Sequence, residues 1–111
     1  MITPTLAQEV SRLEADLCFA LSDPTRILIL YALSERSQNV NEITAALNIT
    51  QPTTSRHLKI LRDRGLVTAN RQGTTITYQL VDIRLIQALD LLRSVLRDSL
   101  IRRASLVEEL D

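Results

Sequence analysis

The chain has 111 residues, of which 45% are hydrophobic and 13 each are basic and acidic, so the formal net charge is zero. A chain of this length forms one modest core, which predicts a single domain over residues 1–111. Because there is no excess of positive charge, any binding to nucleic acid depends on local charge. The longest apolar run, residues 27–33, is far below the roughly 20 residues that cross a bilayer, and no signal peptide is recognisable, so we expect a cytoplasmic protein with no membrane partner.

A helix is predicted over residues 5–20. Leu6, Val10, Leu13 and Leu17 repeat there at intervals of three and four residues. This spacing forms the apolar seam of an amphipathic helix that packs along a partner. The segment is therefore a candidate dimerisation helix.

Capping residues mark the next three helices. Asp23 followed by Pro24 predicts the start of a helix that runs to about residue 35. The polar stretch 34–41 is predicted as a loop, and Asn41 with Glu42 starts a short helix that directs Ile43, Ala46 and Leu47 inward and ends at Asn48. Thr50 caps the following helix, which has Pro52 in its first turn and ends at Gly65.

The helix after Thr50 divides into two faces. Thr54, Leu58 and Leu61 share one stripe, whereas Ser55, Arg56 and Lys59 point away from it. The second helix of a helix-turn-helix needs this division, because its inner face is buried while its outer face lies in a DNA major groove. We therefore predict a helix-turn-helix over residues 42–64.

A β-hairpin and a long helix complete the chain. Residues 67–80 alternate at Ile76, Tyr78 and Leu80 and turn at Gln72-Gly73, which predicts the wing of a winged helix. Helical spacing returns from residue 82 to about 108. Its apolar positions are Leu85, Leu89, Leu92 and Leu96. This is a second candidate dimerisation helix, and the predicted fold is mainly α with a small hairpin.

The neutral total hides a local basic region. Between residues 51 and 80 there are five basic side chains and one acidic side chain, a local charge of +4, against −4 over the rest of the chain. Lys and Arg can neutralise phosphates, and Gln, Thr, Ser and Arg can contact base edges. The candidate DNA contacts are Gln51, Thr53, Ser55, Arg56, His57, Lys59, Arg62, Arg71 and Thr74. The alternative is a solvated helix face, and for His57 a packing role at the helix edge.

Three segments together resemble a known family. They are ALSDPTRILIL at 20–30, ITQPTTSRHLKILRDRGLV at 49–67 and RQGTTITYQL at 71–80. In order and spacing they are similar to the ArsR-type winged helix-turn-helix repressors. The resemblance implies five helices with a hairpin before the last, and a homodimer through helices 5–20 and 82–108. It also implies that the protein binds a palindromic double-stranded DNA operator and that an inducer releases the protein from it.

The sensor sites of that family are not matched. Residues 42–47 have no thiol where arsenic, cadmium and lead sensors carry a Cys-x-Cys pair. The last helix offers Asp82, Asp90 and Asp98 but no His or Cys, a poor donor set for transition metals. The sequence predicts no metal and no cofactor, and it leaves the inducer unknown.

Cys18 is the single cysteine and leaves two interpretations open. On a dimerisation helix, two copies could form an intersubunit disulfide or bind a soft metalloid. Otherwise it is a small buried core residue, as free cysteines often are.

Two further classes of function were compared with DNA binding. A winged helix used for protein association would expose an apolar patch on the helix after Thr50, where the outward residues are instead Ser, Arg, Lys and Asp. An enzyme would need a nucleophile beside a base or a phosphate-binding loop, and neither pattern is present in the sequence. The sequence therefore predicts no catalysis.

Overall fold

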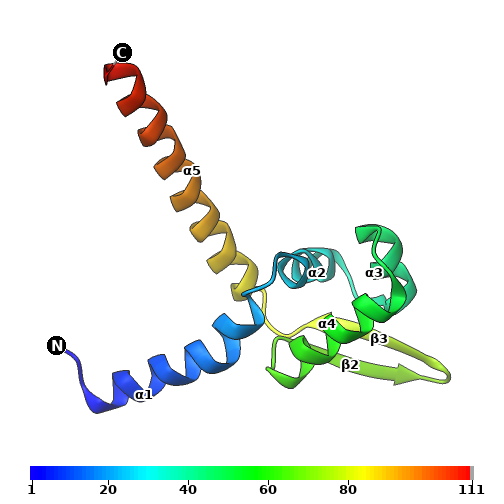
Figure 1. The fold of residues 1–111 in the computed structure, drawn as a ribbon. Coiled ribbons are helices and arrows are strands. Elements are labelled where there is room, and N and C mark those ends of the chain that lie inside the picture. Colours follow the sequence, from blue (N-terminus) through cyan, green and yellow to red (C-terminus); the bar gives the residue numbers. More distant parts are fainter. Residues whose placement is uncertain (111) are drawn as a thin grey trace.

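The structure, a computed structural model, describes residues 1–110. Its elements follow the predicted order of helices with a hairpin before the last helix (Figure 1). They are α1 (Pro4–Arg12), the π-helical segment η1 (Leu13–Cys18), α2 (Pro24–Glu35), β1 (Gln38–Asn39), α3 (Val40–Leu47), α4 (Gln51–Asp63), β2 (Val67–Gln72), β3 (Thr75–Leu80) and α5 (Arg84–Leu110).

Side-chain caps explain where most helices begin. The Asp23 carboxylate accepts from the amide of Thr25 at 2.8 Å, and the Thr50 hydroxyl accepts from the amide of Thr53 at 3.3 Å, as predicted. Asn48 ends α3 with φ 53°, which confirms its predicted left-handed conformation.

The start of α3 differs from the prediction. The cap is Asn39, two residues earlier than Asn41, and its side chain and that of Glu42 satisfy each other's backbone amides in a capping box. Residues 38–39 are not a loop but the strand β1. Ala46, predicted to point inward, is exposed.

Residues 5–20 do not form one regular helix, because a π-helical turn occupies Leu13–Cys18. The amide of Phe19 bonds to the carbonyls of Glu14 and Asp16 and not to that of Ala15. A π-helical turn is wider than an α-helical one, and it leaves a carbonyl available to a partner outside the helix.

The sheet is antiparallel, with strand order β1-β3-β2. The hairpin pairs Val67 with Leu80 and Gln72 with Thr75, so Gly73, at φ 65°, and Thr74 form the turn. The predicted turn at Gln72-Gly73 is therefore one residue early. Tyr78 packs against the core, as predicted.

The core lies between α2, α3, α4, the base of the hairpin and the start of α5. Ile29, Leu30, Ile43, Leu58 and Leu61 are almost completely buried. Burial of each such side chain contributes roughly 1.5–3 kcal/mol of hydrophobic free energy.

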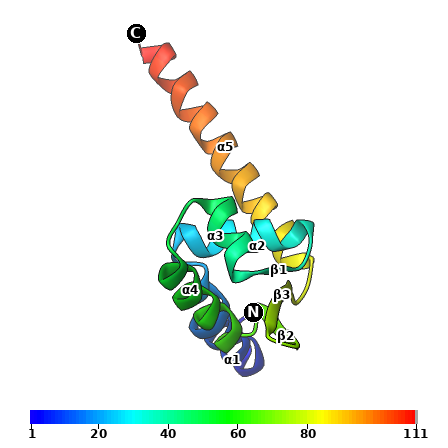
Figure 2. The same cartoon turned by 90° about the vertical axis from the view of Figure 1, so that its right-hand side faces the viewer.

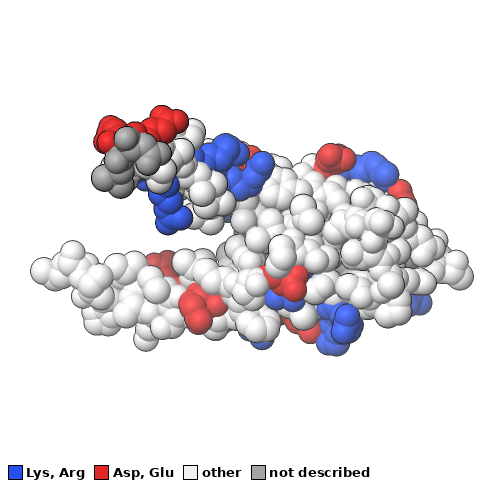
Figure 3. Space-filling view, turned by 45° about the horizontal axis from the view of Figure 1, so that its top comes forward, with Lys and Arg blue, Asp and Glu red and all other residues white. Residues whose placement is uncertain are grey.

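Two arms extend from this body. Figures 1 and 2 show α1 and the second half of α5 leaving the body without packing against another element of the chain. The two arms explain the long dimension of 61 Å in an extent of 61 × 41 × 21 Å. Figure 3 shows open space between the arms, and the α1 arm is largely uncharged in that view. Within residues 1–110, no helix combines the length and the apolar character that crossing a bilayer requires.

Candidate nucleic-acid interface

The outward face of α4 carries a row of polar and basic side chains. Five of the predicted contacts on this helix are exposed: Gln51, Ser55, Arg56, Lys59 and Arg62. Thr53 is half-buried, and its hydroxyl accepts from the Thr50 hydroxyl at 2.8 Å and from Arg56 Nη2 at 3.4 Å. One face of α4 therefore presents several hydrogen-bonding groups to solvent.

The inner face of α4 is fixed on α3 partly by a buried polar contact. Thr54 is fully buried, and its hydroxyl donates to the Thr50 carbonyl at 3.0 Å, the bond back along the helix expected for a buried threonine. The hydroxyls of Thr54 and Thr44 also lie 2.8 Å apart. This contact links α4 to α3 by a polar pair at their interface.

Lys59 has a partner on the same helix. Its ammonium group lies 2.9 Å from the Asp63 carboxylate, and this hydrogen bond lowers the pKa of Asp63 below its ordinary value. Both side chains are exposed and one helical turn apart, so the pair is weak and Lys59 can exchange Asp63 for a phosphate at little cost.

The wing carries two further predicted contacts. Arg71 near the end of β2 and Thr74 in the turn are both exposed. A shallow groove between the starts of α3 and α4 and the wing is lined by Gln51 and Thr74. Gln51 on α4 and Thr74 on the wing, both predicted DNA contacts, therefore line the same groove.

Arg64 belongs to the local basic charge but has a structural role. Its Nη1 donates to the Ala15 carbonyl in η1 at 2.6 Å and lies 3.7 Å from Asp16, and its guanidinium lies 4.3 Å from the centre of the Phe19 ring. The end of α4 is therefore tied to the π-helical segment. This contact could not be predicted from the sequence, because 49 residues separate the two groups.

His57 is half-buried on the side of α4 that faces α2, with Nδ1 3.3 Å from Nη1 of Arg26. Arg26 is itself buried, although no carboxylate accepts a hydrogen bond from its guanidinium among the described contacts. Of the two roles considered for His57, this geometry favours packing against Arg26 over an exposed phosphate contact.

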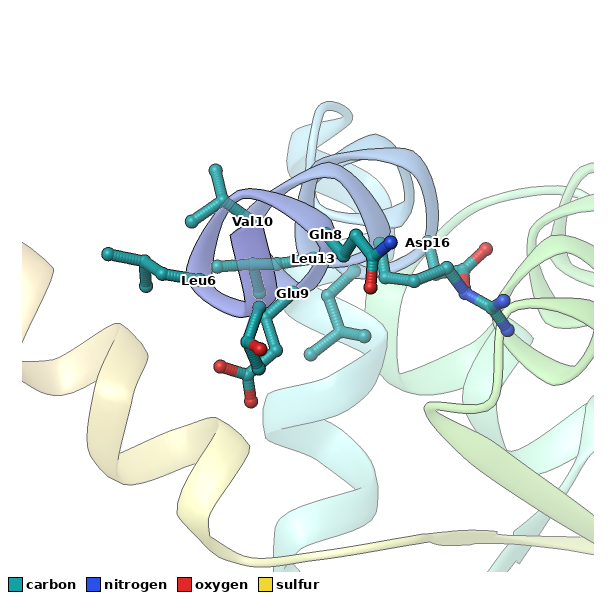
Figure 4. Close-up of a pocket in the computed structure, with 9 residues that line it drawn as sticks. Leu6, Gln8, Glu9, Val10, Leu13 and Asp16 are labelled. Carbon is teal, nitrogen blue, oxygen red and sulfur yellow. The ribbon is translucent and has the colours of Figure 1, made fainter. Parts of the chain in front are cut away.

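The predicted dimer seam is divided between two environments. Leu89 is buried in the subunit's own core, and Leu17 and Leu85 pack against that core. The remaining predicted positions are exposed: Leu6, Val10, Leu13, Leu92 and Leu96. Figure 4 shows Leu6, Val10 and Leu13 along a shallow groove formed by α1 and η1. Further exposed apolar residues of the α5 arm lie outside the predicted seam: Leu91, Val95, Leu100, Ile101, Leu106 and Val107.

Cys18, at the end of η1, is exposed rather than buried in the subunit. Within residues 1–110, no group of three or more His, Cys, Asp or Glu side chains is placed to hold a metal ion.

Comparisons with known proteins agree on one family. Residues 23–69 match the model of the bacterial regulatory proteins of the arsR family. The transcriptional repressor SmtB of Mycobacterium tuberculosis is 40% identical over 75 residues, 68% of this chain and 56% of SmtB, so the chain spans about half the length of that relative. A helix-turn-helix regulator of Methanocaldococcus jannaschii, MJ1325, is 44% identical over 71 residues, 63% of this chain and 80% of the relative.

Solved structures extend the similarity to the whole fold. The homodimeric winged helix-turn-helix DNA-binding domain of Mb0332 from Mycobacterium bovis has 26% identity and a TM-score of 0.74, over 89% of this chain and 91% of that domain. The order of helices, the hairpin before α5 and the exposed polar face of α4 agree with this match. The chain belongs to the ArsR family of winged helix-turn-helix regulators.

Proposed function

We propose that this protein is a sequence-specific DNA-binding transcriptional repressor that acts as a homodimer. The observation that carries the proposal is the two-sided α4, whose inner face is buried on α3 while its outer face exposes hydrogen-bonding and basic groups next to the wing. Each subunit would insert α4 into one major groove of a two-fold operator, with half-sites about one helical turn apart. The protein would then work in the cytoplasm, where the DNA is.

The exposed apolar side chains of α1 and α5 support the homodimer. Each of five apolar side chains is about 40–60% exposed in the single subunit: Leu6 and Val10 on α1, Leu13 at the start of η1, and Leu92 and Leu96 on α5. We refer to these five residues as the arm surface. Pairing of two arm surfaces would bury apolar area and would fix the distance between the two copies of α4. The homodimeric structure of Mb0332 supports the same assembly.

An inducer would release the operator by favouring a different dimer geometry. We propose no metal ion for this role, because the donor sets of the metal sensors are missing from the sequence. Cys18 is exposed, so a thiol-dependent response is included in the experiment below.

The test is a fluorescence-anisotropy titration of the purified protein against duplexes from upstream of its own coding sequence. An unrelated duplex of the same length is the control, and each titration is run at several salt concentrations with Cys18 reduced and then oxidised. Selective, salt-dependent binding in the reduced state supports the proposal. Loss of binding on oxidation alone makes Cys18 a thiol sensor, and equal binding to both duplexes contradicts sequence-specific recognition.

Variants on α4 separate base reading from phosphate binding. Arg56→Ala should lower the preference for the operator over the control duplex by about 5- to 150-fold, which corresponds to roughly 1–3 kcal/mol for a bidentate contact with a base. Lys59→Ala should weaken binding to both duplexes and lower the slope of log K against log salt by about one. Both affinities are read by anisotropy, and unchanged binding of both variants would remove α4 from the interface.

A further inference from the structure

Arg26 connects the two parts of the subunit that the proposed function must coordinate. Its Nε donates to the Ala20 carbonyl at 2.7 Å and its Nη2 to the Phe19 carbonyl at 3.3 Å, at the end of the helical segment that begins with α1. Its Nη1 lies 3.3 Å from Nδ1 of His57 on α4. A single buried side chain therefore touches both the DNA-binding helix and the residues that connect the α1 arm to the body.

The contact between Arg26 and His57 requires one protonation state of the imidazole. Arginine has donors but no acceptor, so Nδ1 of His57 must accept and must carry no proton. Protonation of the imidazole at Nδ1 converts the acceptor into a donor and sets two cations against each other. Loss of this hydrogen bond therefore follows directly from protonation, with no other change in the chain.

The elements that pack against α4 carry several charged groups, of which Arg26 and Asp23 are the ones related to His57. Arg26 lies on α2, and Asp23 caps that helix. Burial alone would raise the pKa of Asp23, but hydrogen bonds from the backbone amides of Thr25 and Arg26 and the charge of the Arg26 side chain hold that pKa below its ordinary value, so Asp23 stays ionised. The other elements contribute Asp16, which faces Arg64, Glu42, which is paired with Arg36 at 2.6 Å, and Arg71, which is exposed on the wing. On α4 itself the charged residues closest to His57 in sequence are Arg56 and Lys59, and both are exposed.

We propose that His57 is a positioning residue whose neutral imidazole, through Arg26, holds α4 in register with the arm, and that protonation of His57 weakens operator binding. This inference rests on the proposed function, because the two copies of α4 are placed by the arms. A dimer binds two half-sites at once only when its two α4 helices have the correct separation. Protonated His57 releases one tie that sets this separation.

The direction of the pH effect separates this role from a simple phosphate contact. A histidine that binds phosphate gains affinity when it becomes charged, so operator binding would strengthen as the pH falls. A positioning histidine has the opposite effect, so that operator binding weakens as the pH falls. His57 is the single histidine of the chain, so comparison with a variant that lacks it assigns the sign.

The first experiment measures affinity for the upstream duplex between about pH 7.5 and pH 5.5, where histidine ordinarily titrates, for the wild type and His57→Gln. The expected result is a loss in wild-type affinity of up to about tenfold per pH unit for each proton taken up. His57→Gln should lose this dependence, because the glutamine amide oxygen accepts from Arg26 at every pH. Wild-type affinity that rises on acidification, or identical pH profiles for the two proteins, would overturn the inference.

A second measurement needs no DNA. The ¹⁵N NMR spectrum of the imidazole in the intact protein at neutral pH should show the Nε2–H tautomer with an unprotonated Nδ1, and an Nδ1–H tautomer would overturn the inference. Selective binding at neutral pH without the expected pH dependence would leave the proposed function standing and remove the role of His57. Absence of selective binding at neutral pH would remove both.

Discussion

Replacing Leu96 with arginine is expected to leave the subunit folded but monomeric. The side chain is 59% exposed in the single subunit, so the folded subunit tolerates the charge. In the proposed dimer the same position lies in the arm surface, where an unpaired charge would be desolvated at high cost. Sedimentation equilibrium should show the mass of one subunit. Operator affinity should fall by about 10²–10⁴-fold, because the two half-sites are then bound independently.

Ile101→Arg is the matched control for this prediction. Ile101 is 64% exposed on the same helix, but it lies five residues beyond Leu96 and therefore about 140° around the helix axis. Arg97 and Ser105 lie one helical turn from Ile101 on the same face of α5, so the arginine introduced at position 101 lies among polar side chains. The control should remain dimeric and retain its affinity. If both variants dimerise normally, the arm surface is not the interface.

The sequence contained enough to predict the elements whose ends depend on neighbouring residues. Asp23 and Thr50 bond to amides two or three residues away, and Asn48 and Gly73 adopt positive φ within a turn. Such local signals can be seen in one sequence without knowledge of the fold. The π-helical turn at Leu13–Cys18 had no comparable signal, since its apolar spacing is that of an ordinary helix.

The division of the leucine seam could not be predicted for a different reason. Leu89 and Leu96 lie seven residues apart and so occupy equivalent positions in the repeat, yet Leu89 is 6% exposed and Leu96 is 59% exposed. The repeat defines which face of α5 is apolar, but the body of the domain determines how far along α5 that face is covered. Where the body ends is a tertiary property, and the same holds for the distant contacts of Arg26 and Arg64.

Arg26→Met is expected to lower the free energy of unfolding by about 2–3 kcal/mol, since it leaves a buried carbonyl without a donor. The amide four residues after Ala20 would ordinarily bond to its carbonyl, but that residue is Pro24, which has no N–H. Arg26 Nε supplies the missing donor at 2.7 Å, and Ala20 is completely buried, so water cannot replace it.

Urea unfolding, followed by circular dichroism at fixed protein concentration, measures the effect of Arg26→Met. Arg12→Met is the control, because Arg12 makes only an exposed pair with Asp16 at 3.1 Å, and its loss should change stability by less than about 1 kcal/mol. Methionine keeps much of the apolar stem of arginine, so the difference between the two variants isolates the buried hydrogen bonds. Equal losses in the two variants would mean that Arg26 contributes no more than a surface arginine and that the link from the arm to α4 is not held by this side chain.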